Sequence, residues 1–189
     1  LVEEIYNTVF AFRDQKADIT EMGGRILPLS STRRQDYEMA LFNLTETYPL
    51  FLKNAPIPAT RVVIKAIGFH IEHEGKLASD AQNTAFNFSG IQTRIIEDRS
   101  HSWDVADTHR HDDPIKLMDT FYQYVMELGN DINNTDLCRQ ILNVIAQENR
   151  YAVIWYKIIR CGNENPSTWG PLVRPLAWAI PVLTNLDTL

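Results

Sequence analysis

The sequence predicts a mainly α-helical domain in which antiparallel helix pairs stack into an irregular array. Apolar residues recur with helical spacing along most of the 189 residues. Short joints that contain Pro, Gly or Asn separate these segments. Successive helix pairs span roughly 40 residues, which is the size of the units in HEAT-like and TPR-like repeats. No consensus repeat motif occurs in the sequence, so a globular helical bundle remains the alternative.

The clearest unit is a pair of helices that begins at Thr32. Thr32 and Gln35 have the spacing of a capping box. Helical spacing then places one set of residues on the inner face of the first helix: Tyr37, Ala40, Leu41, Leu44 and Tyr48. The segment 54–58, which contains two prolines, predicts a tight joint before the second helix. The inner face of that helix is Val63, Ala66, Ile67, His70 and Ile71.

Two details of the N-terminal half are also predicted. Residues 2–16 have an apolar stripe that indicates a helix, and its members are Val2, Ile5, Val9 and Phe12. Pro49 interrupts the first helix of the pair, because a proline lacks the backbone N–H that a helix interior needs. We therefore expect residues 48–53 to form a kinked last turn or a separate short helix.

The helical period disappears between Gly75 and Asp113, which predicts an insertion at residues 76–112. Within it, two runs rich in aromatic and β-branched residues, 84–88 and 91–96, flank the pair Ser89-Gly90. This arrangement is typical of a β-hairpin. Three further helices follow Asp113-Pro114, up to Gly162, and a last helix at about 171–187 should be kinked by its prolines.

Composition restricts the class of protein. The net charge of −6 argues against a general nucleic-acid binder, which needs a basic surface. No apolar run is long enough for a membrane span and no secretory signal is present, so we expect a cytoplasmic protein. Cys138 and Cys161 are expected to be reduced core thiols. The chain is expected to be one helical domain, 1–189, and both ends have the pattern of cuts through a longer protein.

The insertion supplies the candidate site residues. Its apolar side chains lie outside the helical pattern, and if they project they form an exposed patch of the kind that marks a partner surface. These predicted partner-binding residues are Phe86, Phe88, Ile91, Ile95 and Trp103. The alternative is that the hairpin folds back and one of its faces covers the helices.

Imidazoles and carboxylates are dense at the end of the insertion and offer a second candidate site. Side chains of these types bind divalent metals. The candidate ligands are His101, Asp104, His109, His111 and Asp112. The alternative is a solvated acidic loop, and we expect no cofactor in this chain.

One stretch resembles a known group of proteins. The run from Ile26 to Ala40, continued by residues 48–52 and 55–60, looks like the helical region that follows the ATPase core in bacterial STAND-type NTPases, a group that includes Avs-like antiviral defence proteins. The resemblance implies that the chain belongs to a helical array that senses a foreign protein, with any oligomerisation driven by flanking domains. The family's Walker motifs are absent from this sequence, so the ATPase itself is not part of it.

The leading functional hypothesis is a non-catalytic, protein-binding helical region of a larger defence NTPase. A metal-dependent hydrolase or nuclease that uses the cluster at 101–113 is one alternative. A scaffold or oligomerisation module is the other.

Overall fold

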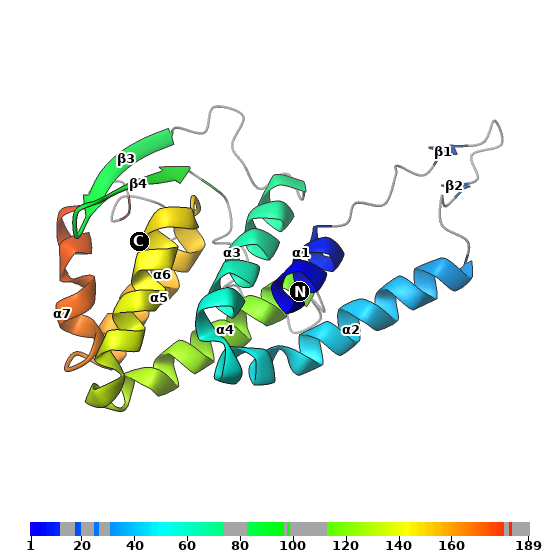
Figure 1. Cartoon of the computed structure of the whole chain (residues 1–189). Coiled ribbons are helices and arrows are strands. Elements are labelled where there is room, and N and C mark those ends of the chain that lie inside the picture. The colour runs from blue at the N-terminus through cyan, green and yellow to red at the C-terminus, as the bar shows by residue number, and fades with distance from the viewer. Residues whose placement is uncertain are drawn as a thin grey trace.

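The structure is mainly helical and carries a small antiparallel hairpin (Figure 1). The computed structural model describes residues 1–11, 18–19, 25–26, 31–73, 83–96, 98, 113–179 and 182. The predicted helical class and the β-hairpin are therefore confirmed. A repeat array is not confirmed, because α3 (Pro56–His73) contacts α1 (Val2–Phe10), α2 (Ser31–Asn54), α4 (Asp113–Gly129) and α5 (Thr135–Glu148). In a repeat array each unit contacts only its neighbours.

The joint between α2 and α3 lies where the sequence predicts it but is shorter, because Asn54 and residues 56–58 of the expected break belong to the two helices. Helix α2 ends at Asn54 and α3 begins at Pro56, so Ala55 alone joins them. The hydroxyl of the fully buried Tyr48 donates to the backbone oxygen of Ala59 over 2.9 Å, which connects the two helices next to the joint. This hydrogen bond fixes the angle at which α3 leaves α2.

Pro49 does not divide α2, contrary to the sequence prediction of a separate short helix. The helix runs without a break from Ser31 to Asn54, with Pro49 inside it. A proline in a helix interior costs about 3 kcal/mol. Pro49 lies on the exposed side, whereas Tyr48 and Leu52 beside it are fully buried. Burial of side chains of this size contributes about 1.5–3 kcal/mol each, which offsets the cost.

Helix α1 packs through a different face from the predicted one. Its buried residues are Tyr6 and Phe10, while Val2 and Ile5 are about half exposed. The Tyr6 hydroxyl donates to the backbone oxygen of Leu44 over 2.8 Å, and its ring stacks on Phe51. The buried face of α1 is therefore shifted by one residue from the predicted stripe, which was wrong. Tyr6 can be buried because its hydroxyl is hydrogen-bonded, and the aliphatic side chains next to it stay partly exposed. Phe12, its last member, lies outside the described residues.

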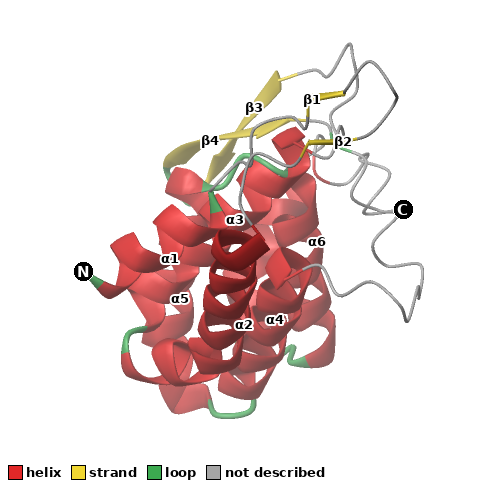
Figure 2. Cartoon of the chain, turned by 90° about the vertical axis from the view of Figure 1, so that its right-hand side faces the viewer, coloured by secondary structure: helices red, strands yellow, loops and turns green. Residues whose placement is uncertain are grey.

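The hairpin consists of β3 (Asn83–Phe88) and β4 (Ile91–Ile96), with Phe88 opposite Ile91. Ser89 and Gly90 both have positive φ, of 49° and 89°, as a two-residue type I′ turn requires. The hairpin covers one end of the helices (Figure 2). A second antiparallel pair, β1 (Asp18–Ile19) and β2 (Arg25–Ile26), was not predicted, because two-residue strands carry no readable periodicity.

The C-terminal half continues the helical packing. A 3-10 turn, η2 (Ile132–Asn134), joins α4 to α5, and α6 (Ala152–Glu164) follows α5 after a short link. Helix α7 (Trp169–Val173) then leads into a second 3-10 turn, η3 (Arg174–Trp178). The single kinked helix predicted at 171–187 is therefore wrong over residues 171–178, which form the end of α7 and the 3-10 turn η3. In the described part of the chain, none of the helices combines the length and the apolar character that a membrane crossing requires.

The contact between Gly129 and Trp169 provides a test of the packing. A Cβ atom at Gly129 would lie 2.5 Å from Cδ1 of Trp169, whose ring is fully buried and donates through Nε1 to the backbone oxygen of Val125. We expect Gly129→Ala to lower the free energy of unfolding by about 1–3 kcal/mol through overpacking. Urea unfolding measures this change.

Gly170→Ala is the matched control. The nearest atom to a Cβ at Gly170 is 3.8 Å away, which is an ordinary contact. Replacing Gly by Ala in an open helical position normally stabilises by about 0.5–1 kcal/mol. Equal stability of the two variants would contradict the packing described here.

Candidate partner-binding site

The hairpin residues predicted to bind a partner lie mostly inside this chain. Phe86, Phe88 and Ile95 are 8%, 1% and 2% exposed. The rings of Phe86 and Phe88 lie 5.7 and 5.2 Å from that of Trp155, centroid to centroid. Of the two alternatives, the hairpin therefore folds back onto the helices. Ile91 is partly buried and packs against the core.

The remaining members of the predicted sites fall outside the described residues. These are Trp103 and the candidate metal ligands His101, Asp104, His109, His111 and Asp112. Among the residues that are described, no group of three or more His, Cys, Asp or Glu side chains is placed to hold a metal ion. The metal site therefore stays a prediction.

Both thiols are core groups, as the sequence predicts. Cys138 and Cys161 are fully buried and are not joined in a disulfide. Burial raises the pKa of Cys138 to about 11 and that of Cys161 to about 12. Because the thiolate is the reactive form, neither cysteine is a nucleophile at neutral pH.

The feature that sequence reasoning missed is the outer face of α2. Three large apolar side chains point away from the bundle: Met39 is 60% exposed, Phe42 54% and Leu50 63%. Their spacing of three and eight residues places them on one side of the helix, with the exposed Glu46 between Phe42 and Leu50. The opposite face of the same helix holds the buried Tyr48 and Leu52. The outer side of α2 therefore carries exposed apolar side chains among polar ones, and we call Met39, Phe42 and Leu50 the outer stripe.

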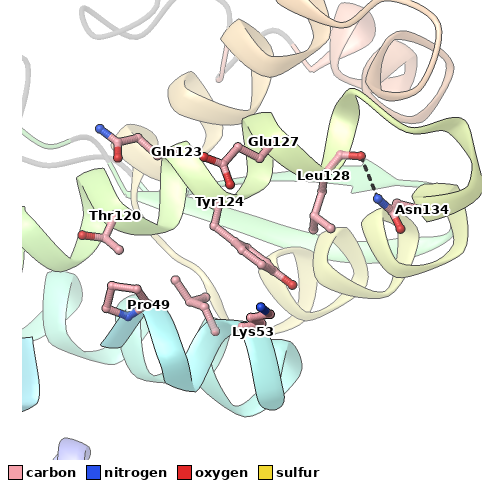
Figure 3. Close-up of a pocket in the computed structure, with 9 residues that line it drawn as sticks. Pro49, Lys53, Thr120, Gln123, Tyr124, Glu127, Leu128 and Asn134 are labelled. Carbon is pink, nitrogen blue, oxygen red and sulfur yellow. Dashed lines mark hydrogen bonds between the residues drawn. The ribbon is translucent and has the colours of Figure 1, made fainter. Parts of the chain in front are cut away.

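A groove of about 530 Å³ lies next to the outer stripe, between α2 and α4 (Figure 3). Its walls come from the end of α2, from the second half of α4 and from η2. The lining residues are Pro49, Leu52, Lys53, Thr120, Gln123, Tyr124, Glu127, Leu128 and Asn134. Pro49 lines the groove, and Leu50 of the outer stripe is the next residue of α2.

Two polar contacts involve the elements that form the groove. Nζ of Lys116 on α4 lies 2.6 Å from Oε1 of Glu46 on α2. The Asn134 side-chain amide donates to the backbone oxygen of Leu128 over 3.2 Å. The ring of Tyr124 extends across the groove from α4 toward α2 (Figure 3). Burial raises the pKa of Tyr124, so its hydroxyl stays protonated at neutral pH and can donate a hydrogen bond.

The groove has charged groups of both signs. Within the described part of the chain, neither Lys53 nor Glu127 forms an ion pair. Apolar side chains, here Leu52 and Leu128, line the same groove. A lining of this kind suits binding through apolar contacts and hydrogen bonds.

Comparison with known proteins adds no relative: no protein-family model, no curated protein and no solved structure matches the chain. The function is therefore argued from the surfaces of this structure.

The buried thiols give a direct test of the core around α5 and α6. We expect neither Cys138 nor Cys161 to react with an aromatic disulfide reagent at pH 8 over minutes, since both are buried and protonated. After unfolding in urea both should react quickly, because an exposed thiol has a pKa of about 8.5. Fast labelling of the native protein would contradict this packing.

Proposed function

We propose that the chain is a non-catalytic protein-binding module whose partner docks on the outer stripe of α2. The observation that carries the proposal is that α2 buries one apolar face in its own bundle and presents three large apolar side chains, each more than half exposed, on the opposite side. Exposed apolar groups that share one surface are a frequent mark of protein–protein contact. Phe and Met are also enriched at the centres of such interfaces.

The size of the outer stripe fits a partner-binding role. Covering the exposed part of Met39, Phe42 and Leu50 would contribute roughly 1–2 kcal/mol for each side chain. Such a centre forms a small hot spot when polar groups surround it. Lys53 and Glu127 in the adjoining groove supply polar groups of both charges. An amphipathic helix of the partner could place its apolar face along α2 and its polar residues in the groove.

The resemblance to STAND-type NTPases extends the proposal. If it holds, the helices would belong to a longer irregular array, and the docked partner would be a foreign protein that the array senses. The outer stripe would then be the recognition surface, in place of the hairpin residues that are buried against Trp155.

Site-specific photo-crosslinking tests the proposal. We expect benzoylphenylalanine at position 42, in the native host, to give a discrete crosslinked protein, because Phe42 lies at the centre of the outer stripe. Position 140 is the control, since Gln140 is an exposed helical residue on α5 away from that stripe. The same products from both positions, or none from position 42, would refute the docking surface. A crosslink to a second copy of this chain would instead support the scaffold function.

Substitutions then measure the contribution of the surface. We expect Phe42→Ser and Leu50→Ser each to weaken binding of the crosslinked partner by at least tenfold, equivalent to about 1.4 kcal/mol. The free energy of unfolding should change by no more than about 0.5 kcal/mol, since both side chains are exposed. Calorimetry measures the affinity and urea unfolding measures the stability.

A further inference from the structure

A second, smaller hollow lies where the β3–β4 hairpin meets the C-terminal end of α5. Its volume is about 260 Å³. Apart from Ala146, the residues that line it have polar side chains, of which two are arginines and four are carboxamides. They are Asn83, Gln92, Arg94, Gln147, Asn149 and Arg150. None of the described residues that line this hollow is a carboxylate, although the chain as a whole carries a net charge of −6.

The alternation of β4 places the first arginine on the exposed face of the hairpin, where it is among the residues that line the hollow. Thr93 and Ile95 are buried toward the helices, so Gln92 and Arg94 lie together on the opposite, exposed face. The Thr93 hydroxyl donates to the backbone oxygen of Ala146 over 2.9 Å. This hydrogen bond holds β4 against the last turn of α5.

The link between α5 and α6 carries the second arginine. The backbone N–H of Ile96 donates to the backbone oxygen of Arg150 over 2.7 Å, which joins the link to β4. The Asn149 side chain holds the same link through its two hydrogen bonds with the backbone of Tyr151. Both arginines therefore extend from segments whose backbone positions are fixed relative to each other.

None of the described acids neutralises either arginine. Glu148 is already bound to Arg61, with Nε and Oε1 2.8 Å apart. Asp98 is buried and accepts a hydrogen bond from the backbone N–H of Ala152. Over the described ranges, Arg94 and Arg150 form no ion pair. Two guanidinium groups thus share one hollow, and no described residue supplies a counter-charge.

The C-terminal end of α5 accounts for the position of only one of the two arginines. A cation near a helix C-terminus interacts favourably with the helix dipole, and Arg150 lies two residues beyond the last residue of α5. Arg94 comes from the hairpin and not from this helix. The side-chain amides of Asn83, Gln92 and Gln147 are exposed and bond to no other described residue. The dipole of α5 does not account for the presence of Arg94 beside these donors.

We propose that this hollow binds the phosphate group of a phosphomonoester. Guanidinium groups present paired N–H donors that match phosphate oxygens, and the neighbouring amides can donate to the oxygens that remain. The hollow is smaller than the roughly 300–1,000 Å³ typical of whole-ligand pockets, which suits a terminal phosphate that projects into it. Its lining has no nucleophile, so the phosphate is bound and not transferred. This site is separate from the outer stripe of α2.

Titration with inorganic phosphate tests the site. We expect saturable shifts of the Gln92, Arg94 and Gln147 amide resonances in NMR spectra, measured against sodium chloride at equal ionic strength. The variant Arg94→Gln/Arg150→Gln should bind phosphate at least tenfold more weakly, and Arg174→Gln, at an exposed arginine on η3, should bind it as wild type does. Both single variants are also measured, so that the proposal stays testable if the double variant fails to fold.

Two results would overturn the proposal. One is that phosphate shifts these resonances no more than chloride does, and the other is that the arginine variants bind it as tightly as wild type. Phosphoserine and glycerol 3-phosphate then separate the two sources of the group. Tighter binding of phosphoserine indicates a phosphorylated side chain, tighter binding of glycerol phosphate indicates a small metabolite, and either order supports the site.

Discussion

Helix α3 is stable in water only when other elements cover its wide apolar face, and the rest of the structure satisfies this requirement. Most of its circumference is buried, while Arg61, Lys65 and Glu72 lie on the remaining side; the buried residues are Ala59, Thr60, Val62, Val63, Ile64, Ala66, Ile67, Gly68 and Ile71. A helix with so wide an apolar face belongs to the core. Leaving its large side chains exposed would forfeit about 1.5–3 kcal/mol for each. Helices α1, α2, α4 and α5 supply the cover.

This arrangement explains why α2 is left with an unused face. Helix α2 contacts α1, α3 and α4, and the side that contains Tyr48 and Leu52 is buried among them. It also extends past α1 at the edge of the bundle (Figure 1). On its outer side, Glu46 pairs with Lys116 of α4, while Met39, Phe42 and Leu50 stay in contact with solvent. A peripheral position and three exposed apolar side chains together make α2 the best candidate for an interface.

The sequence predicts local features well and long-range ones poorly. Pro56 and the Ser89-Gly90 pair mark a joint and a turn whose residue chemistry is local, and the structure has both in the expected places. The face of α1 was wrong because the hydrogen bond that selects Tyr6 reaches Leu44, 38 residues away. Pro49 was read as a break because a local rule ignores the burial of its neighbours.

The candidate sites show the same limit. The outer stripe could have been found by counting apolar residues on both faces of α2. The apolar residues of the inner face already explain the helical spacing, so the exposed ones on the outer face attract no notice. The hollow with Arg94 and Arg150 could not have been found in this way, since 56 positions separate the two residues and only the packing of β4 on α5 brings them together. Charge patterns in sequence carry no information about such long-range pairs.

The position of the hairpin has a consequence for synthesis of the chain. Strands β3 and β4 leave the ribosome before α5 and α6, which provide their docking surface through Ala146 and Trp155. A two-stranded hairpin is marginally stable on its own. Until about seventy more residues have been added after Phe86, the rings of Phe86 and Phe88 have no core to enter. The nascent chain therefore passes through a stage in which these two phenylalanines are accessible to chaperones or to other nascent chains.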